Sequence, residues 1–244
     1  MEAAASVDRL YVFQEYVNGD DMEAKQVTKS KLSTGIVLEN VTVKTPQQKV
    51  VVRNLNIRIE RGEMLLLKGN SGIGKTSLLR AIAGLWPIPY GQISKPDKKD
   101  IFFVPQKPYM KLGTLRDQLC YPRNIIFSDY AIQQTLHEVR LSNIAEEYSN
   151  IASIRQDWAR VLSLGEQQRL SFARILLYSP KFVILDEATS AIDIDTERHL
   201  YGLLEKRGVT CVSVGHRPTL AKYHGRSLEL IGRGEWKAET MKTN

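Results

Sequence analysis

The chain has 244 residues, of which 43% are hydrophobic and 25% are charged, and its formal net charge is +7. This composition is typical of a soluble globular protein, and the length suits one domain, or one domain with a subdomain, around a substantial core. The basic residues are scattered, without a basic helix or an aromatic-interleaved stripe, so we expect no nucleic-acid partner. No stretch approaches the roughly 20 apolar residues of a membrane-spanning helix.

The first segment, residues 1–33, differs from the rest of the chain. Residues 3–17 fit a helix with Leu10, Phe13 and Val17 on one face, and a polar stretch follows. We interpret this segment as a linker and as the end of the last helix of a preceding membrane domain, which would make the chain a fragment of a longer protein. A disordered leader is the alternative.

After this segment, strand patterns and helix patterns alternate. Apolar runs predict strands over residues 36–43, 50–59, 64–67, 101–104, 182–185 and 209–214. A helix is predicted over residues 77–83, ending at Gly84, and residues from about 112 to 170 are predicted to be mainly helical, with breaks at Pro122 and around Ser149. Such alternation indicates an α/β fold with a mainly parallel sheet, in which ligands bind beyond the carboxyl ends of the strands.

The motif with the most specific chemistry lies between the 64–67 strand and the 77–83 helix. Its residues fit the pattern G-x-x-x-x-G-K-[ST] and are Gly69, Asn70, Ser71, Gly72, Ile73, Gly74, Lys75 and Thr76, with Ser77 following. Backbone N–H groups of such a loop surround a phosphate, and the helix adds the positive end of its dipole. Lys75 is placed to reach the β- and γ-phosphates, and the Thr76 hydroxyl to ligate Mg²⁺. A glycine-rich turn is the alternative, but the flanking strand and helix favour a phosphate-binding loop.

Three other predicted strands end in polar residues. Asp186 and Glu187 follow the 182–185 strand, His216 follows the 209–214 strand, and Gln106 follows the 101–104 strand. Taken singly, the acidic pair suits a helix cap, the histidine suits a satisfied surface residue, and the glutamine indicates nothing. Together, at one edge of a parallel sheet, these residues predict a phosphoryl-transfer site.

Each of these side chains suits one step of phosphoryl transfer. Asp186 is expected to hold Mg²⁺ through water, and Glu187 to orient and deprotonate the attacking water. His216 is expected to hydrogen-bond the γ-phosphate, and Gln106 to contact the metal or the attacking water. Lys75 completes this catalytic set.

A second anion site is predicted at Ser163, Gly165 and Glu166, just before a helical stretch. A small hydroxyl residue and a glycine at a helix start present free backbone N–H groups to an anion. By itself this pattern more often marks only a capped helix start. The phosphate loop and the polar strand ends on either side of it in the sequence favour the anion site.

The order and spacing of these motifs resemble the nucleotide-binding domain of ATP-binding-cassette (ABC) transporters over about residues 34–244. The resemblance rests on the phosphate loop, Gln106, the signature at 162–167, the 182–187 strand, the D-loop at 190–193, and His216. Finer features resemble subfamily D, the half-transporters of peroxisomes and lysosomes with their plant and bacterial relatives. These features are residues 84–87, 105–109, 113–118, 121–122, 216–220, 223–224 and 234–237.

This resemblance implies a RecA-like P-loop NTPase core, an antiparallel β subdomain and a helical signature subdomain over about residues 110–172. The implied cofactors are ATP and Mg²⁺. The implied partners are a transmembrane domain and a second nucleotide-binding domain, identical or related, that pairs head to tail. In such a pair, Ser163, Gly165 and Glu166 serve the nucleotide held by the partner's phosphate loop.

Two features depart from the common family pattern. Leu164 and Glu166 stand where glycine and glutamine are usual, although Ser163 and Gly165 are kept. Residues 36–68 contain no aromatic side chain, so we expect adenine to be held in another way than by stacking there.

We therefore expect an ATP-hydrolysing motor domain that powers transport, with fatty acids or acyl-CoA as the favoured cargo. Its expected place is the cytosolic face of a membrane, the peroxisomal membrane being favoured over lysosomal, ER, plastid or bacterial inner membranes. The alternatives are a soluble cassette ATPase of DNA repair or translation, a regulatory module that binds without hydrolysing, and a small-molecule kinase or GTPase. Intact Lys75, Glu187 and His216 argue against the regulatory module.

Overall fold

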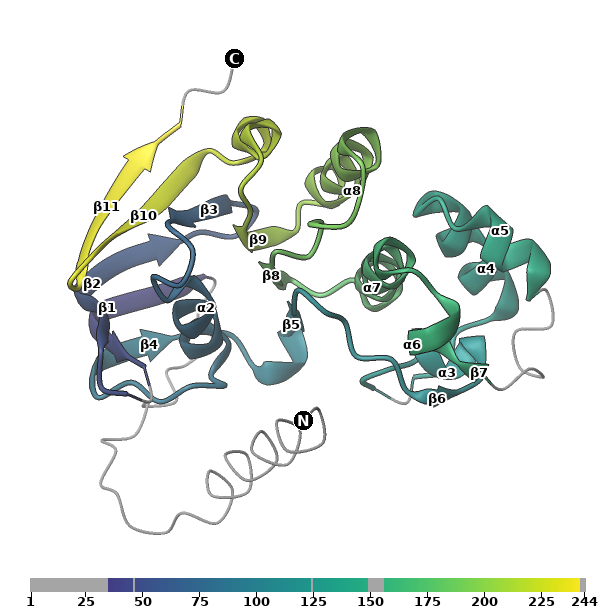
Figure 1. Ribbon diagram of the computed structural model, residues 1–244, viewed down its shortest axis with the longest axis horizontal. Helices are drawn as coiled ribbons and strands as arrows, with labels where there is room; N and C mark the ends of the chain where they lie inside the picture. Colours follow the sequence, from purple (N-terminus) through teal and green to yellow (C-terminus); the bar gives the residue numbers. More distant parts are fainter. Residues whose placement is uncertain (1–34, 46, 124, 149–155, 242–244) are drawn as a thin grey trace, which may run out of the picture.

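The computed structural model describes residues 35–45, 47–123, 125–148 and 156–241 (Figure 1). The helix and linker expected within residues 1–33, and the break expected at Ser149, lie outside the described residues. Within the described ranges, no helix has both the length and the apolar character needed to cross a bilayer.

A six-stranded sheet forms the centre of the molecule, in the order β11-β10-β3-β9-β8-β5. Its strands are β3 (Met64–Gly69), β5 (Ile101–Val104), β8 (Phe182–Asp186), β9 (Thr210–Val214), β10 (Arg226–Gly232) and β11 (Glu235–Thr240). All neighbours pair in parallel except β10 with β11. The four strands predicted to end in functional residues are therefore parallel neighbours in one sheet, which confirms the α/β prediction.

The central sheet is buried on both faces. Leu65 and Leu67 of β3 pack into one hydrophobic cluster, and Met64 and Leu66 pack into another on the opposite face. Strands covered on both faces need apolar residues at every position, which explains why they appear in the sequence as unbroken apolar runs.

On one face of the central sheet lie α2 (Lys75–Ala83) and a second, antiparallel sheet (Figure 1). This sheet has the order β2-β1-β4, formed by β1 (Ile36–Lys44), β2 (Val50–Ile59) and β4 (Tyr90–Ser94). The inward side chains of β1 and β2 join those of α2 and the central strands in one cluster. Gly84 caps α2 in the left-handed conformation, as the sequence predicts.

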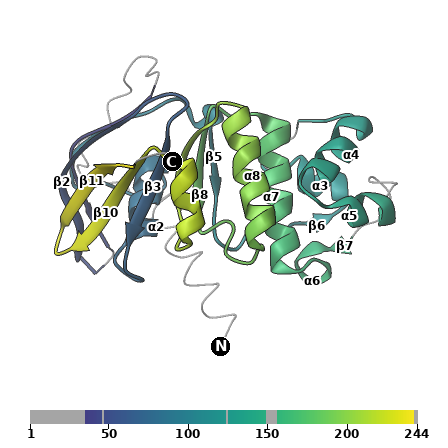
Figure 2. The ribbon, with the colours of Figure 1, turned by 90° about the horizontal axis from the view of Figure 1, so that it is seen from above.

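The other face carries α7 (Leu164–Tyr178) and α8 (Ile194–Lys206), which run side by side (Figure 2). Beyond α7 lie the shorter helices α3 (Leu115–Leu119), α4 (Asp129–Glu138), α5 (Ser142–Glu147) and α6 (Trp158–Val161). A two-stranded ribbon of β6 (Leu112–Gly113) and β7 (Gln156–Asp157) closes this region. The region is mainly helical as predicted, while its ribbon was not expected.

Candidate nucleotide site

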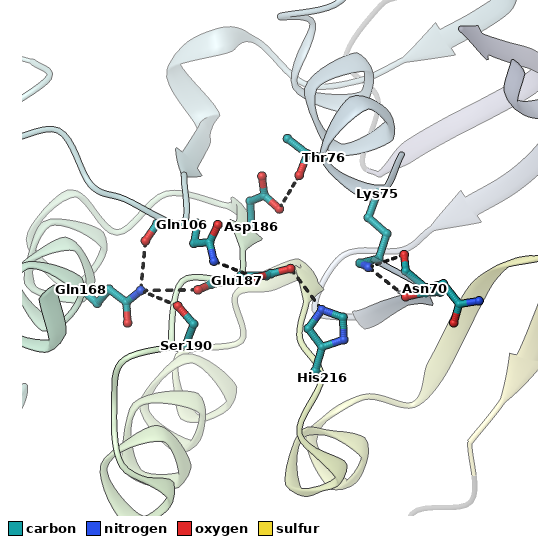
Figure 3. A network of polar contacts seen from close by, with 10 residues as sticks. Asn70, Lys75, Thr76, Gln106, Gln168, Asp186, Glu187, Ser190 and His216 are labelled. Atoms are coloured by element: carbon teal, nitrogen blue, oxygen red, sulfur yellow. Dashed lines mark hydrogen bonds and ion pairs between the residues drawn. The ribbon is translucent and has the colours of Figure 1, made fainter. Parts of the chain in front are cut away.

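The phosphate-binding loop connects β3 to α2. Gly69 ends β3, and α2 begins at Lys75 and contains Thr76 and Ser77 in its first turn. The buried Lys75 ammonium donates to the carbonyl oxygens of Gly69, at 2.8 Å, and Asn70, at 3.0 Å (Figure 3). Since an ammonium has three N–H donors, Lys75 is held by the loop and keeps one donor for a phosphate oxygen.

The loop is open to an anion on its outer side. Asn70, Ser71 and Gly72 are exposed, while Ile73 packs on the cluster beneath α2. Gly74 has a φ of 112°, and a Cβ there would lie 2.5 Å from a methyl group of Val51 on β2, so only glycine fits. The first turn of α2 contains no acidic side chain, which leaves the positive end of its dipole available to a phosphate.

Next to the loop, the Thr76 hydroxyl donates to an Asp186 carboxylate oxygen at 3.0 Å. Burial raises the pKa of Asp186, and the neighbouring Glu187 carboxylate raises it further, so a cation beside Asp186 would be stabilising. Hydroxyl and carboxylate oxygens suit Mg²⁺, which usually keeps waters and phosphate oxygens as its other ligands. Two of the three side chains predicted to contact the metal, Thr76 and Asp186, therefore lie together, and their oxygens fit Mg²⁺.

Glu187 lies at the centre of a cluster of three side chains from three strand ends (Figure 3). One of its carboxylate oxygens accepts from the Gln106 side-chain amide at 2.8 Å, and the other lies 3.1 Å from His216 Nε2. Because a carboxylate only accepts, Nε2 is the donor. Glu187 has a φ of 49°, a left-handed conformation that non-glycine residues rarely adopt and that is found disproportionately at functional sites.

Of the residues predicted to act as metal or water ligands, Gln106 is arranged differently from Asp186 and Thr76. Its side chain binds Glu187 rather than the Thr76–Asp186 pair. Its predicted contact with the attacking water suits this position beside Glu187, and its predicted metal contact stays a prediction.

The signature residues lie at the start of α7. Ser163 caps the helix, and its hydroxyl and its N–H both donate to Glu166, whose other carboxylate oxygen accepts from Asn143. The pKa of Glu166 is lowered, because these hydrogen bonds outweigh the opposing effect of its burial. Glu166 thus replaces the usual glutamine as part of a capping box.

Gly165 faces the loop that follows β8. A Cβ at Gly165 would lie 2.8 Å from the carbonyl oxygen of Ala191, so a larger residue would push the signature away from this loop. Among the described residues, no hydrogen bond or ion pair joins Ser163, Gly165 or Glu166 to the phosphate loop of the same chain. The structure therefore brings the predicted site together in two separate groups.

One buried side chain that the sequence analysis missed connects these regions. Gln168 on α7 donates its side-chain amide to the Gln106 carbonyl and the Ser190 hydroxyl, both at 3.0 Å (Figure 3). Its oxygen accepts from the Ala191 N–H at 3.0 Å. The available signal was a row of polar residues at helical spacing, Gln168, Ser171 and Arg174, of which the last two lie in a stretch that is otherwise apolar from Leu170 on.

A loop of this form at the head of a helix, with Asp186, Glu187, Gln106 and His216 at neighbouring strand ends, defines a P-loop nucleotide-binding domain. The protein-family model described as "ABC transporter" matches residues 52–190, which is more than half of the chain. The chain belongs to the ABC transporter family.

Several curated relatives match most of the chain. An uncharacterized ABC transporter ATP-binding protein of Synechocystis sp. is 44% identical over 97% of this chain and 37% of its own length. ATP-binding cassette sub-family D member 3 of Homo sapiens is 40% identical over 83% of this chain and 31% of its own length. ABC transporter D family member 1 of Arabidopsis thaliana is 38% identical over 96% of this chain and 18% of its own length. The resemblance to subfamily D is thus confirmed, and the chain spans between 18% and 37% of the length of these relatives.

Among solved structures, that of a bacterial Atm1-family ABC exporter with ATP bound has a similar fold. The TM-score is 0.78 at 19% sequence identity, over 98% of this chain and 45% of that one. Together with the family match, this similarity confirms the predicted ABC ATPase fold. Family membership implies an ATPase.

Proposed function

We propose that the chain is the ATP-binding and ATP-hydrolysing motor domain of a membrane transporter. The observation that carries this proposal is the contact of Glu187 with both Gln106 and His216, beside the phosphate loop. A domain that only binds nucleotide has no need of a carboxylate held between two such side chains, so this geometry favours a hydrolytic domain over a regulatory module.

In the proposed reaction, water attacks the γ-phosphorus of ATP and the bond to the β-phosphate oxygen breaks, giving ADP and phosphate. The loop N–H groups and Lys75 bind the phosphates, and Thr76 and Asp186 would hold Mg²⁺, which neutralises phosphate charge when bound. Glu187 accepts the proton of the attacking water, and Gln106 keeps its carboxylate in place. With ATP bound, the Nε2–H of His216 would turn from Glu187 to the γ-phosphate.

We infer that the active unit is a head-to-tail pair of such domains. Ser163 and Gly165 lie apart from the phosphate loop of their own chain, and a second copy or a close relative would bring its own phosphate loop against them. The Ser163 hydroxyl would then turn from Glu166 to the partner's γ-phosphate, while the α7 N-terminus supplies N–H groups. Glu166 itself, predicted to bind nucleotide, would act through Ser163.

A cavity of about 430 Å³ beside β5 supports the proposed docking of a transmembrane domain. Its lining is mostly apolar and aromatic, and includes Leu85, Phe103, Pro105, Tyr109 and Tyr121. The lining includes Pro105, directly before Gln106, and Pro108 and Tyr109 after it, so a segment bound in the cavity would contact the loop that positions Glu187. We propose that this loop carries the signal between nucleotide site and membrane domain.

The favoured cargo is a fatty acid or acyl-CoA, and the favoured location is the cytosolic face of the peroxisomal membrane. Both proposals rest on the similarity to subfamily D. Lysosomal, ER, plastid or bacterial membranes and a soluble cassette ATPase are the alternatives. ATPase activity of the full-length transporter in vesicles should rise when a long-chain acyl-CoA is added and stay constant with free CoA.

The ATPase proposal is tested by phosphate release from the purified chain with Mg²⁺ and ATP. We expect turnover that is abolished by chelating Mg²⁺. Lys75→Ala should weaken ATP binding itself, at least tenfold, because it removes a charged partner of the phosphates. An unmodified chain that binds ATP stoichiometrically but releases no phosphate at any protein concentration would favour the regulatory alternative.

A further inference from the structure

A buried carboxylate that the proposed reaction does not use lies close to the active residues. Glu197 belongs to α8, and its side chain is only 2% exposed. It accepts hydrogen bonds from the hydroxyl groups of Thr189, at 2.7 Å, and Thr219, at 3.0 Å. The Arg217 guanidinium lies 3.4 Å from the same carboxylate.

These three partners come from two different loops. Thr189 lies in the loop after β8, two residues beyond Glu187. Arg217 follows His216 in the loop after β9, and Thr219 lies at the start of the short helix that continues this loop. Arg217 makes a second link by donating to the Ser190 carbonyl at 3.3 Å. One carboxylate therefore ties the loop that carries the proposed base to the loop that carries its histidine partner.

The cluster borders the active residues directly. A cavity of about 150 Å³ is lined by Glu187, His216, Glu197 and Arg217, among others. An ionised carboxylate without partners would be strongly disfavoured in such a place, and hydroxyl donors and a guanidinium are the groups that make it stable. Loss of one partner should therefore disturb the loops rather than only a surface contact.

We propose that Glu197 is a positioning residue that sets the spacing between Glu187 and His216. The Glu187 N–H donates to the Val214 carbonyl at the end of β9, at 3.2 Å, which fixes the backbone of Glu187 but not the segment that carries His216. The 3.1 Å contact between the two side chains also depends on how that segment is held beyond β9. Glu197 adds a side-chain connection there from α8. The role in turnover rests on the proposed ATPase function, whereas the effect on the Glu187–His216 contact does not.

The experiment compares Glu197→Gln, Thr189→Val and Thr219→Val with a matched control, Thr135→Val. Thr135 is a similarly buried threonine whose hydroxyl bonds only to the Ala131 carbonyl of its own helix, α4. Each variant is assayed for ATP dissociation constant and kcat, well below its own unfolding temperature. The imidazole ¹⁵N resonances of His216 are recorded in parallel, and the chain has only four histidines to assign.

We expect Glu197→Gln to lower kcat about tenfold and to leave the ATP dissociation constant within about twofold, because Lys75 and its loop are untouched. The His216 Nε2 resonance should move toward that of a solvent-exposed imidazole. The two threonine variants should each lower kcat a few-fold, and neither should add to the loss in a Glu197→Gln background. Thr135→Val should keep kcat and the His216 resonance unchanged.

Unchanged His216 resonances in a folded Glu197→Gln protein would overturn the proposal, as would threonine effects that add in full to that of Glu197→Gln. If Glu197→Gln fails to fold, the two threonine variants test the proposal without it. A kcat and His216 resonances equal to those of the unmodified chain in both threonine variants would then overturn the positioning role. An unmodified chain without ATPase activity would contradict the proposed function instead, and the ¹⁵N measurement would still test the positioning role.

Discussion

His224 shows how one buried residue supports the loop that carries His216. Its ring is 1% exposed, Nδ1 donates to the Leu220 carbonyl at 2.7 Å, and Nε2 accepts from the Ser213 hydroxyl at 2.5 Å. Ser213 lies on β9, and Leu220 lies in the short helix η2 (Pro218–Tyr223) that follows His216. The bond that Nε2 accepts needs a neutral imidazole, and burial lowers the pKa of His224 to about 4.

This shift predicts a specific dependence of stability on pH. Between its unfolded pKa near 6.5 and its native pKa near 4, His224 binds a proton in the unfolded chain but not in the native state. The free energy of unfolding therefore decreases as the pH is lowered through this range. Between pH 7 and pH 4 this residue should remove about 3 kcal/mol. Urea unfolding of His224→Gln should therefore show a pH dependence flatter by that amount. An equally steep dependence in the variant would contradict the assignment.

At the scale of elements, α7 connects the signature to the rest of the site through Gln168. We expect Gln168→Met to fold but to lower kcat at least tenfold, because the Gln106 carbonyl and the Ala191 N–H lose a buried partner and the loops around Glu187 shift. Gln118→Met is the matched control, since Gln118 is equally buried and the hydrogen bonds of its side chain go to the backbone of Lys111. Urea unfolding and phosphate release measure the two effects, and equal losses of kcat in both variants would contradict this role.

The elements that could be predicted from the sequence are those marked by a contiguous motif or by an unbroken run of apolar residues. The phosphate loop is contiguous, and β3, β8 and β9 are buried on both faces, so their apolar runs are plain. β4, β10 and β11 were missed. β11 is an edge strand with mostly exposed side chains, and β4 has only one buried residue, Ile93, so neither strand has an apolar run.

The parts of the site that escaped prediction depend on contacts between distant segments. Gln168 and Gln106 are 62 residues apart, and Thr219 and Glu197 are 22 apart. A glutamate on an amphipathic helix is usually solvated, so nothing local marks Glu197 as buried. The four strand-end residues were predictable because parallel strands bring their carboxyl ends to one edge.

At the scale of the whole molecule, the two anion-binding groups lie at different places on one chain. The phosphate loop with Glu187 forms one group, and the start of α7 with Ser163 and Gly165 forms the other. The loop after β8 connects the two groups. It begins with Glu187 of the first group, and its Ala191 contacts α7 at Gln168 and Gly165. Such an arrangement suits two copies that each complete the other's site, and we therefore expect dimers that form when ATP is bound.

The most direct test is the mass of a Glu187→Gln variant, measured by light scattering with and without ATP. Removing the proposed base should stop hydrolysis while leaving Lys75 and the loop able to bind ATP, so the variant should form a stable dimer only when ATP is present. Adding Ser163→Ala to this variant should weaken the dimer, because the partner's nucleotide loses a ligand. A variant that binds ATP as a monomer at every concentration, or that hydrolyses ATP at the parental rate, would contradict the composite site.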